Sequence, residues 1–260
     1  MSANVRRYGA GHMRVLALHC TLGHSGNWRR FAAGMPETFQ LVAPDLPGHG
    51  KNSVWYGDGD YQDVCVSSLL PVFDAPSHLI GHSFGAIVAL RLAVEHPELV
   101  RSLTLVEPVF FAAAKSEAPE ALENHLCEAG PYLEALARGD KAHAARLFNR
   151  LWGDGTAWQD FPSAARQYMT DRIDLVAAQA AAIFDDRAGL LNPGTLEKLT
   201  IPTLLVRGGK SPSIIETIHS ALLKRMPNAH DTTIGDASHM LVMSHAEALS
   251  HVYSDFLEMA

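Results

Sequence analysis

A serine lies between two glycines in the stretch Gly81–Gly85 (GHSFG), where an apolar run gives way to a helical pattern. The run ends at Ile80, and apolar residues then recur at helical spacing until Pro97. A serine at such a junction can serve simply as a helix cap. In the G-x-S-x-G pattern, however, a very tight turn raises the hydroxyl clear of the sheet at a helix N-terminus. The stretch indicates that Ser83 is a nucleophile, provided that the rest of the chain supplies its partners.

The elements that would position Ser83 alternate along the chain. Short apolar runs, several of them rich in β-branched residues, are mostly separated by segments of helix length. The runs are Arg14–His19, Gln40–Ala43, His78–Gly81, Leu103–Val106, Thr203–Arg207 and Asp231–Ile234. This alternation is typical of βαβ units on a parallel sheet, in which ligands bind beyond the carboxyl ends of the strands. We therefore predict an α/β fold with a mostly parallel sheet flanked by helices, and a site formed by the residues that follow each run.

The alternation is interrupted between residues 111 and 199, where only helical patterns occur. Asp140 is placed to cap one helix, whose apolar stripe reaches Trp152. A second apolar stripe runs from Tyr168 to Ile183. We interpret residues 111–199 as a helical cap inserted into a core formed by residues 1–110 and 200–260. We expect its apolar face to lie over the mouth of the pocket as a lid.

The composition limits the classes of partner. The 260 residues, of which 47% are hydrophobic, suit one large domain, and the net charge of −7 argues against nucleic acid or an anionic membrane surface. No apolar stretch is long enough to span a bilayer, and the N-terminus has no secretory signal pattern. The cysteines are scattered, and no histidine lies in a metal-binding motif. We expect a cytoplasmic monomer or homodimer that acts on a small molecule without a metal or an organic cofactor.

Several motifs occur together in one order along the chain. In sequence order they are His19–Gly23 (HCTLG), Trp28, Asp45–Gly50 (DLPGHG) followed by Ser53, Gly81–Gly85 and Gly235–His239 (GDASH). In this set and order the chain resembles the α/β-hydrolase family, and in particular its capped serine hydrolases with esterase-like or lactonase-like activity. The resemblance covers nearly the whole chain. Only thirteen residues precede Arg14, too few for the family's complete N-terminal hairpin, so we expect fewer than eight strands.

The resemblance implies a nucleophile, a base and an oxyanion hole. Ser83 would attack a carbonyl carbon, and His239, which follows the last apolar run, would take the serine proton. The backbone N–H groups of Thr21 and Phe84 would stabilise the oxyanion. Cys20 stands where the family usually has glycine. We interpret Cys20 as a small buried hydrophobic residue, and a thiol that lines the pocket is the alternative.

The acid of the triad departs from the commonest family pattern. Most relatives place an aspartate after the penultimate strand, but the loop Arg207–Ser213 contains no carboxylate. Glu107 instead follows the fourth apolar run, where some family members, among them certain haloalkane dehalogenases, place their acid. We therefore predict that Glu107 orients His239, which keeps the order Ser–Glu–His along the chain. Glu216 and Asp236 are the alternative acids.

The resemblance leaves the reaction open within one class. Hydrolysis of a small carboxylic ester or lactone through an acyl-enzyme is the function that we expect first. Hydrolysis of a carbon–carbon bond in a diketone, or acyl transfer, would use the same triad, and a ligand-binding receptor without turnover is a further alternative. A serine nucleophile argues against dehalogenase and epoxide hydrolase activity, both of which need aspartate. Five aromatic residues are the candidates for the pocket walls: Trp28, Trp152, Trp158, Tyr168 and Phe184.

Overall fold

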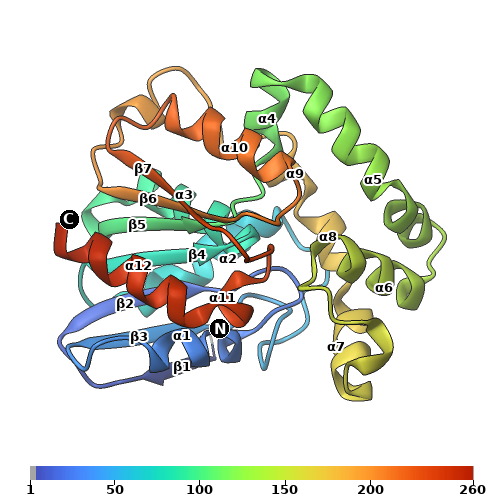
Figure 1. The fold of residues 1–260 in the computed structure, drawn as a ribbon, viewed down its shortest axis with the longest axis horizontal. Helices are drawn as coiled ribbons and strands as arrows, with labels where there is room; N and C mark the ends of the chain where they lie inside the picture. Colours follow the sequence, from blue (N-terminus) through green and yellow to red (C-terminus); the bar gives the residue numbers. More distant parts are fainter. Residues whose placement is uncertain (1–3, 260) are drawn as a thin grey trace.

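The computed structural model describes residues 4–259 and contains a seven-stranded sheet within that range (Figure 1). The strands are β1 (Val5–Tyr8), β2 (Met13–Leu18), β3 (Phe39–Pro44), β4 (Ser77–His82), β5 (Val100–Val106), β6 (Thr203–Gly208) and β7 (Ala229–Ile234). They lie in the order β1-β3-β2-β4-β5-β6-β7, in which β1 is antiparallel to β3 and all other neighbours are parallel. The predicted α/β fold with fewer than eight strands is confirmed, and each predicted run overlaps one strand from β2 to β7.

Strand β1 is the strand that the sequence pattern does not reveal. Its four residues, VRRY, contain two successive arginines instead of an apolar run, and none of its side chains is fully buried. It lies at the edge of the sheet, where its register with β3 runs from Val5↔Pro44 to Tyr8↔Leu41. Side-chain preferences differ between edge and central strands, so a short polar edge strand carries little pattern.

Helices cover both faces of the sheet. One layer contains α2 (Tyr61–Leu69), α3 (Phe84–Glu95) and α10 (Ile214–Leu223), and the other contains α1 (Arg29–Ala33), α11 (Leu241–Ser244) and α12 (Ala246–Met259). Successive residues of a strand serve opposite faces, so Leu79 packs in the first layer and Ile80 in the second. Because both faces are covered, the central strands are apolar almost throughout. No helix among residues 4–259 is both long enough and apolar enough to cross a bilayer.

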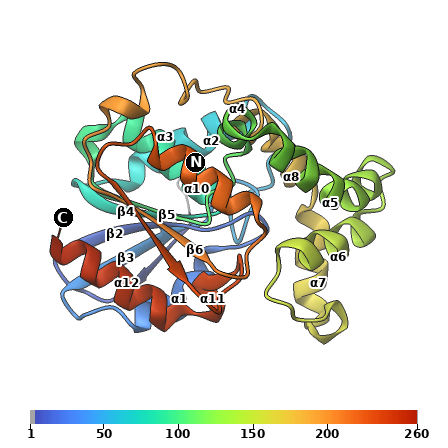
Figure 2. The same ribbon diagram turned by 45° about the horizontal axis from the view of Figure 1, so that its top comes forward.

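The helical block (residues 111–199) begins shortly after β5 and projects beyond one end of the sheet, as both ribbon views show (Figure 1 and Figure 2). Its helices are α4 (Phe111–Glu117), α5 (Pro119–Ala137), α6 (Lys141–Trp152), α7 (Ser163–Arg172), α8 (Asp174–Ala178) and α9 (Ala180–Ile183). Helix α6 is capped where the sequence predicts it, since the carboxylate of Asp140 accepts a hydrogen bond from the backbone N–H of His143 at 3.1 Å.

The second apolar stripe forms three short helices instead of the single helix that its spacing suggests. Ile173 and Gln179 separate α7, α8 and α9. Both breaks lie beside hydrogen bonds to loops of the core. Arg172 Nε donates to the carbonyl of Gly48 at 3.1 Å, and the amide oxygen of Gln179 accepts from the hydroxyl of Thr21 at 2.6 Å. The segment is therefore interrupted where it is bonded to the core, which local helix propensity cannot predict.

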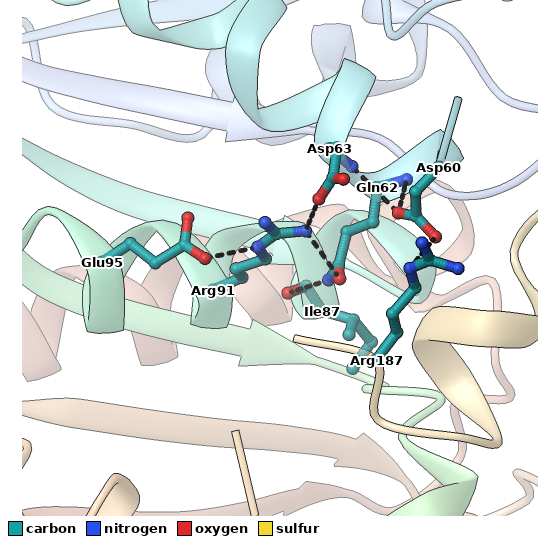
Figure 3. A network of polar contacts seen from close by, with 7 residues as sticks. All are labelled: Asp60, Gln62, Asp63, Ile87, Arg91, Glu95 and Arg187. Carbon is teal, nitrogen blue, oxygen red and sulfur yellow. Dashed lines mark hydrogen bonds and ion pairs between the residues drawn. The ribbon is translucent and has the colours of Figure 1, made fainter. Parts of the chain in front are cut away.

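A polar network joins α2 to α3 and to the segment that follows α9 (Figure 3). Arg91 of α3 lies 2.6 Å from Asp63 and 2.7 Å from Glu95. Asp60 caps α2 by accepting from the backbone N–H of Asp63 at 3.1 Å, and its other oxygen lies 3.6 Å from Arg187 Nε. Such partly exposed pairs contribute little individually. Together they hold α3, whose N-terminus carries the GHSFG turn, against the neighbouring elements.

Candidate active site

The turn between β4 and α3 holds Ser83 in a strained backbone conformation. Ser83 has φ 58° and ψ −120°, a region that costs a non-glycine residue about 1–3 kcal/mol. A Cβ atom on Gly81 would lie 2.3 Å from the carbonyl oxygen of Gly85, and one on Gly85 would lie 2.5 Å from those of Leu18 and His19. The two glycines therefore let the start of α3 pack directly on the end of β2, with Ser83 at the apex of the turn.

Three side chains meet at the carboxyl ends of β4, β5 and β7. Ser83 Oγ lies 3.0 Å from His239 Nε2, and His239 Nδ1 lies 2.9 Å from Glu107 Oε2. The exposed fractions of Ser83, His239 and Glu107 are 5%, 3% and 0%. We refer to these three residues as the triad. A ring that donates its Nδ1 proton to the carboxylate leaves Nε2 free to accept the hydroxyl proton of the serine.

Glu107 is surrounded by hydrogen-bond donors. It follows β5 with φ 52°, and its backbone N–H donates to the carbonyl of Val206 at 2.8 Å. Its Oε1 accepts from the backbone N–H of Gly208 at 2.6 Å and from the hydroxyl of Ser211 at 2.7 Å. Burial raises the pKa of the Glu107 carboxyl, but the hydrogen bond and charge of His239 and the other donors lower it further, so the pKa lies below its usual value. The carboxylate therefore stays charged next to the imidazole.

The two alternative acids lie at the surface. The carboxylates of Glu216 and Asp236 each form an exposed ion pair, and their side chains are 64% and 90% exposed. Within residues 4–259, the carboxylate that is hydrogen-bonded to the His239 ring belongs to Glu107. No group of three or more His, Cys, Asp or Glu side chains in the same range is placed to hold a metal ion.

The backbone N–H groups of Thr21 and Phe84 lie on neighbouring segments. Phe84 is the first residue of α3, where a backbone N–H has no acceptor within the helix. Thr21 follows β2, which is paired with β4. The hydrogen bonds of the described residues engage neither N–H group. Neither N–H group therefore has an acceptor within the described chain, and the N-terminal end of the α3 dipole favours negative charge beside Phe84.

Two buried histidines hold the loop that follows β2. His19 Nε2 accepts from the backbone N–H of Leu46 at 2.9 Å, while its Nδ1 donates to the carbonyl of Cys20 at 2.8 Å. His49 Nε2 accepts from the backbone N–H of Leu22 at 3.1 Å. Burial lowers the pKa of His19 to about 4 and that of His49 well below its ordinary value, so both rings are neutral near pH 7. The motifs contain both residues, but the two backbone N–H groups that donate to them lie 27 positions away in the sequence.

His82, within the GHSFG stretch, supports the opposite side of the site. Its Nε2 donates to the carbonyl of His239 at 2.8 Å, and the two ring centroids are 5.2 Å apart. Burial, and then the neighbouring His239, lower the pKa of His82 to about 3. The neutral ring thus fastens the loop that carries His239 to the turn that carries Ser83. The GHSFG stretch alone does not reveal this role of His82.

A cavity of about 450 Å³ lies beside the triad, between the core and the helical block. Thr21 and Met240 line it on the core side, and Phe148, Trp152, Phe161 and Met169 line it on the side of the block. Ser83, His239 and Glu107 are not among its described lining residues, but the ring of Trp152, which lines it, lies 4.6 Å, centroid to centroid, from that of His239. Among its described lining residues there is neither lysine nor arginine. Asp154, His24, Asn27 and Asn149 also line it, but most of its wall is apolar and suits an uncharged group.

The aromatic residues that we expect in the pocket walls occupy different places. Trp152 and Tyr168 line the cavity. Trp28, Trp158 and Phe184 are not among its described lining residues. Trp28 is fully buried in the core beneath α1 and α12, Trp158 packs against a buried cluster that includes Ala144 and Ala145 of α6, and Phe184 stacks on Phe111 at the base of the block. A large aromatic side chain gains as much from core packing as from a pocket wall, so residue type alone does not separate the two.

Several residues that line the cavity were not predicted from the sequence. Phe148 lies on the predicted stripe of α6, so the pattern could have identified it. Met169, Met240 and Phe161 carry no comparable signal. Cys20 is both buried and part of the wall, and burial raises the pKa of its thiol to about 12, so the thiol stays protonated.

Tyr168 joins the helical block to the two loops of the core that border the site. Its hydroxyl donates to the carbonyl of Gly23 at 2.8 Å and accepts from the backbone N–H of Gly50 at 2.8 Å. The guanidinium of Arg172 lies 3.8 Å from the centre of the Tyr168 ring. This side chain therefore serves both the cavity wall and the attachment of the block.

The chain is similar to known proteins in sequence and in fold. A sequence model described as the alpha/beta hydrolase family matches residues 15–252. A pimeloyl-[acyl-carrier protein] methyl ester esterase from Neisseria meningitidis serogroup B is 31% identical over 237 residues, covering 86% of this chain and 84% of that protein. An esterase from Mycobacterium tuberculosis is 30% identical over 257 residues, covering 92% of this chain and 80% of that protein. The solved structure of a thermophilic esterase from Thermogutta terrifontis has a TM-score of 0.73 at 22% identity. The match covers 98% of this chain and 93% of that protein.

Proposed function

Since the chain belongs to the alpha/beta hydrolase family, we propose that it hydrolyses uncharged carboxylic esters with Ser83 as the nucleophile. One observation carries the proposal: the hydrogen bonds from Ser83 Oγ to His239 Nε2 at 3.0 Å and from His239 Nδ1 to Glu107 Oε2 at 2.9 Å. The relatives named as esterases support the choice of ester hydrolysis within the serine hydrolases.

Acylation begins when His239 Nε2 removes the proton of Ser83 Oγ as that oxygen attacks the ester carbonyl carbon. The carbonyl oxygen becomes an oxyanion, which the backbone N–H groups of Thr21 and Phe84 stabilise. Glu107 keeps the proton of the ring on Nδ1 and stabilises the imidazolium without taking that proton. The imidazolium then protonates the leaving alcohol, and the acyl group remains on Ser83.

Deacylation repeats these steps with water as the nucleophile. His239 Nε2 takes a proton from water, the hydroxide oxygen attacks the acyl carbon, and the oxyanion forms at the same two N–H groups. Collapse of this intermediate returns the proton to Ser83 Oγ and releases the carboxylic acid. The acid loses its proton to water, and the mostly apolar cavity does not stabilise the resulting carboxylate, which favours its departure.

We propose that the helical block forms a lid on a core of residues 1–110 and 200–260. Its apolar side chains Phe148, Trp152 and Met169 supply one wall of the cavity, which supports a role in selecting the substrate. The absence of cationic side chains among the described wall residues supports an uncharged, apolar group on the ester. The three cysteines are free thiols, which supports action in a reducing cytoplasm.

The direct test is the rate of p-nitrophenyl ester hydrolysis by the wild type and by Ser83→Ala. We expect the substitution to lower kcat by about 10³–10⁶-fold. The melting temperature should not fall, because the hydroxyl of Ser83 has no structural partner besides His239 in the described chain. Undiminished activity of Ser83→Ala would overturn the proposal. A lactone and a diketone assayed in parallel show whether the ester is the preferred substrate, and faster turnover of the diketone would contradict that preference.

A further inference from the structure

The last residue of β6 and the loop that follows it each supply one donor to a single oxygen of Glu107. The backbone N–H of Gly208 and the hydroxyl of Ser211 lie 2.6 Å and 2.7 Å from Oε1. The other oxygen, Oε2, faces His239 Nδ1 at 2.9 Å. We propose that Ser211 is a positioning residue of the reaction, whose hydroxyl fixes the rotation of the Glu107 carboxylate so that Oε2 meets the imidazole. This inference rests on the role of Glu107 in the proposed function.

The loop that carries Ser211 is itself fixed to the loop that leads to His239. The backbone N–H of Lys210 donates to the carbonyl of Ala237 at 2.8 Å, and that of Gly209 donates to the carbonyl of Ile234 at 2.9 Å. A Cβ atom on Gly208 would lie 2.3 Å from the carbonyl oxygen of Ala237, so the close approach of the two loops requires glycine. The hydroxyl of Ser211 and the imidazole of His239 are therefore held in fixed positions relative to each other.

A glutamate in this position needs such an anchor more than a shorter acid would. Its carboxylate is separated from the backbone by three rotatable bonds. Without an anchor, rotation about these bonds would place Oε2 next to the imidazole of His239 only part of the time. Two donors on Oε1, one from the end of β6 and one from the loop that follows it, define the plane of the carboxylate as well as its position. Each donor also favours the charged form, which the imidazolium requires. Orientation and charge are thus supplied by a residue that touches neither the serine nor the substrate.

The first test is the pH dependence of kcat/KM for Ser211→Ala, with a p-nitrophenyl ester as substrate. Loss of one hydrogen bond to a charged group should lower kcat/KM at pH 8 by about 10-fold. A carboxylate with one donor fewer is more basic and holds the imidazole proton more firmly, so the acid limb of the profile should move to higher pH. Ser211→Thr keeps the hydroxyl and should restore most of the rate. Ser213→Ala, an exposed serine of the same loop, is the matched control and should leave the profile unchanged.

A double-mutant cycle with Glu107→Gln separates positioning from a general structural effect. If Ser211 acts through Glu107, adding Ser211→Ala to Glu107→Gln should not lower kcat/KM any further. A tenfold loss in both backgrounds would show that Ser211 acts independently of Glu107 and would overturn the inference. A pH profile of kcat/KM for Ser211→Ala that equals the wild-type profile would also overturn the inference. If that variant does not fold, Ser211→Cys, which keeps the size but donates weakly, takes its place with a several-fold loss expected.

Failure of this inference is distinguishable from failure of the proposed function. Full activity of Glu107→Gln alone would refute the role of Glu107, whereas full activity of Ser211→Ala with an inactive Glu107→Gln would refute only the role of Ser211.

Discussion

Replacement of Glu107 by glutamine should disable the site in a specific way. In the wild type, Oε1 of Glu107 accepts from Gly208 and Ser211, and Oε2 accepts from His239. Only the oxygen of a glutamine amide can accept from the first two donors, so the amide NH₂ would face His239 Nδ1. The ring would then carry its proton on Nε2, pointing at Ser83 Oγ, and could not act as a base in that tautomer.

The expected loss of kcat follows from the hydrogen bonds that the glutamine amide would have to break. To restore the productive tautomer, the amide must turn and give up the hydrogen bonds from Gly208 and Ser211, at roughly 1–3 kcal/mol for each donor left unsatisfied. The negative charge that stabilises the imidazolium is lost as well. We therefore expect kcat for Glu107→Gln to fall by about 10³–10⁴-fold. Glu107→Ala leaves both tautomers accessible to His239, so its loss should be smaller, on the order of 10²–10³-fold.

The assay is single-substrate kinetics with a p-nitrophenyl ester, and circular dichroism serves as the check of the fold. Glu216→Gln is the matched control, because its carboxylate is largely exposed and has no contact with the triad. The control should retain wild-type kcat. The reasoning would be refuted if Glu107→Gln kept more than about a tenth of the wild-type kcat, or if it were more active than Glu107→Ala.

Three further outcomes follow from the site and its surroundings. Tyr168→Phe leaves the backbone N–H of Gly50 without its acceptor, so urea titration should show a free energy of unfolding lower by about 1–2 kcal/mol; an unchanged value would mean that the hydroxyl does not secure the helical block. Trp152→Ala enlarges the cavity, so kcat/KM across a series of p-nitrophenyl esters should shift toward longer acyl chains; an unchanged preference would place the acyl group elsewhere. Burial lowers the pKa of His19 to about 4 and of His82 to about 3, below the ordinary histidine value of 6.5, so the unfolded chain takes up protons first as the pH falls. The free energy of unfolding should therefore decrease between pH 6.5 and about 4, by up to about 1.4 kcal/mol per pH unit for each ring, and a flat urea-titration profile would contradict this.

The fold was predictable because its central strands are buried on both faces. Runs such as Leu103–Val106 stand out in the sequence since both layers of helices require apolar side chains. Strand β1 did not stand out, because at the sheet edge its arginines reach solvent and backbone pairing with β3 is sufficient. The helix breaks at Ile173 and Gln179 could not be predicted from the sequence either, since they lie beside hydrogen bonds to loops of the core that are distant in the sequence.

The three residues of the triad were easier to find in the sequence than the residues that hold them in place. Ser83 and His239 follow strands at motif positions, and Glu107 could be inferred from chain order once the later loop was found to lack an acid. Ser211 lies 104 positions from Glu107, and a serine in a loop carries no signal that it bonds a buried carboxylate. The role of His82 was hidden for the same reason, because its partner is a backbone carbonyl 157 positions away.

Covalent labelling with a fluorophosphonate, followed by peptide mass spectrometry, identifies the nucleophile directly. We predict one adduct per chain, on Ser83, and no adduct on Ser83→Ala. The protonated thiol of Cys20 should remain unlabelled, because burial raises its pKa to about 12. An active preparation that stays unlabelled, or an adduct on another residue that abolishes activity, would contradict the account.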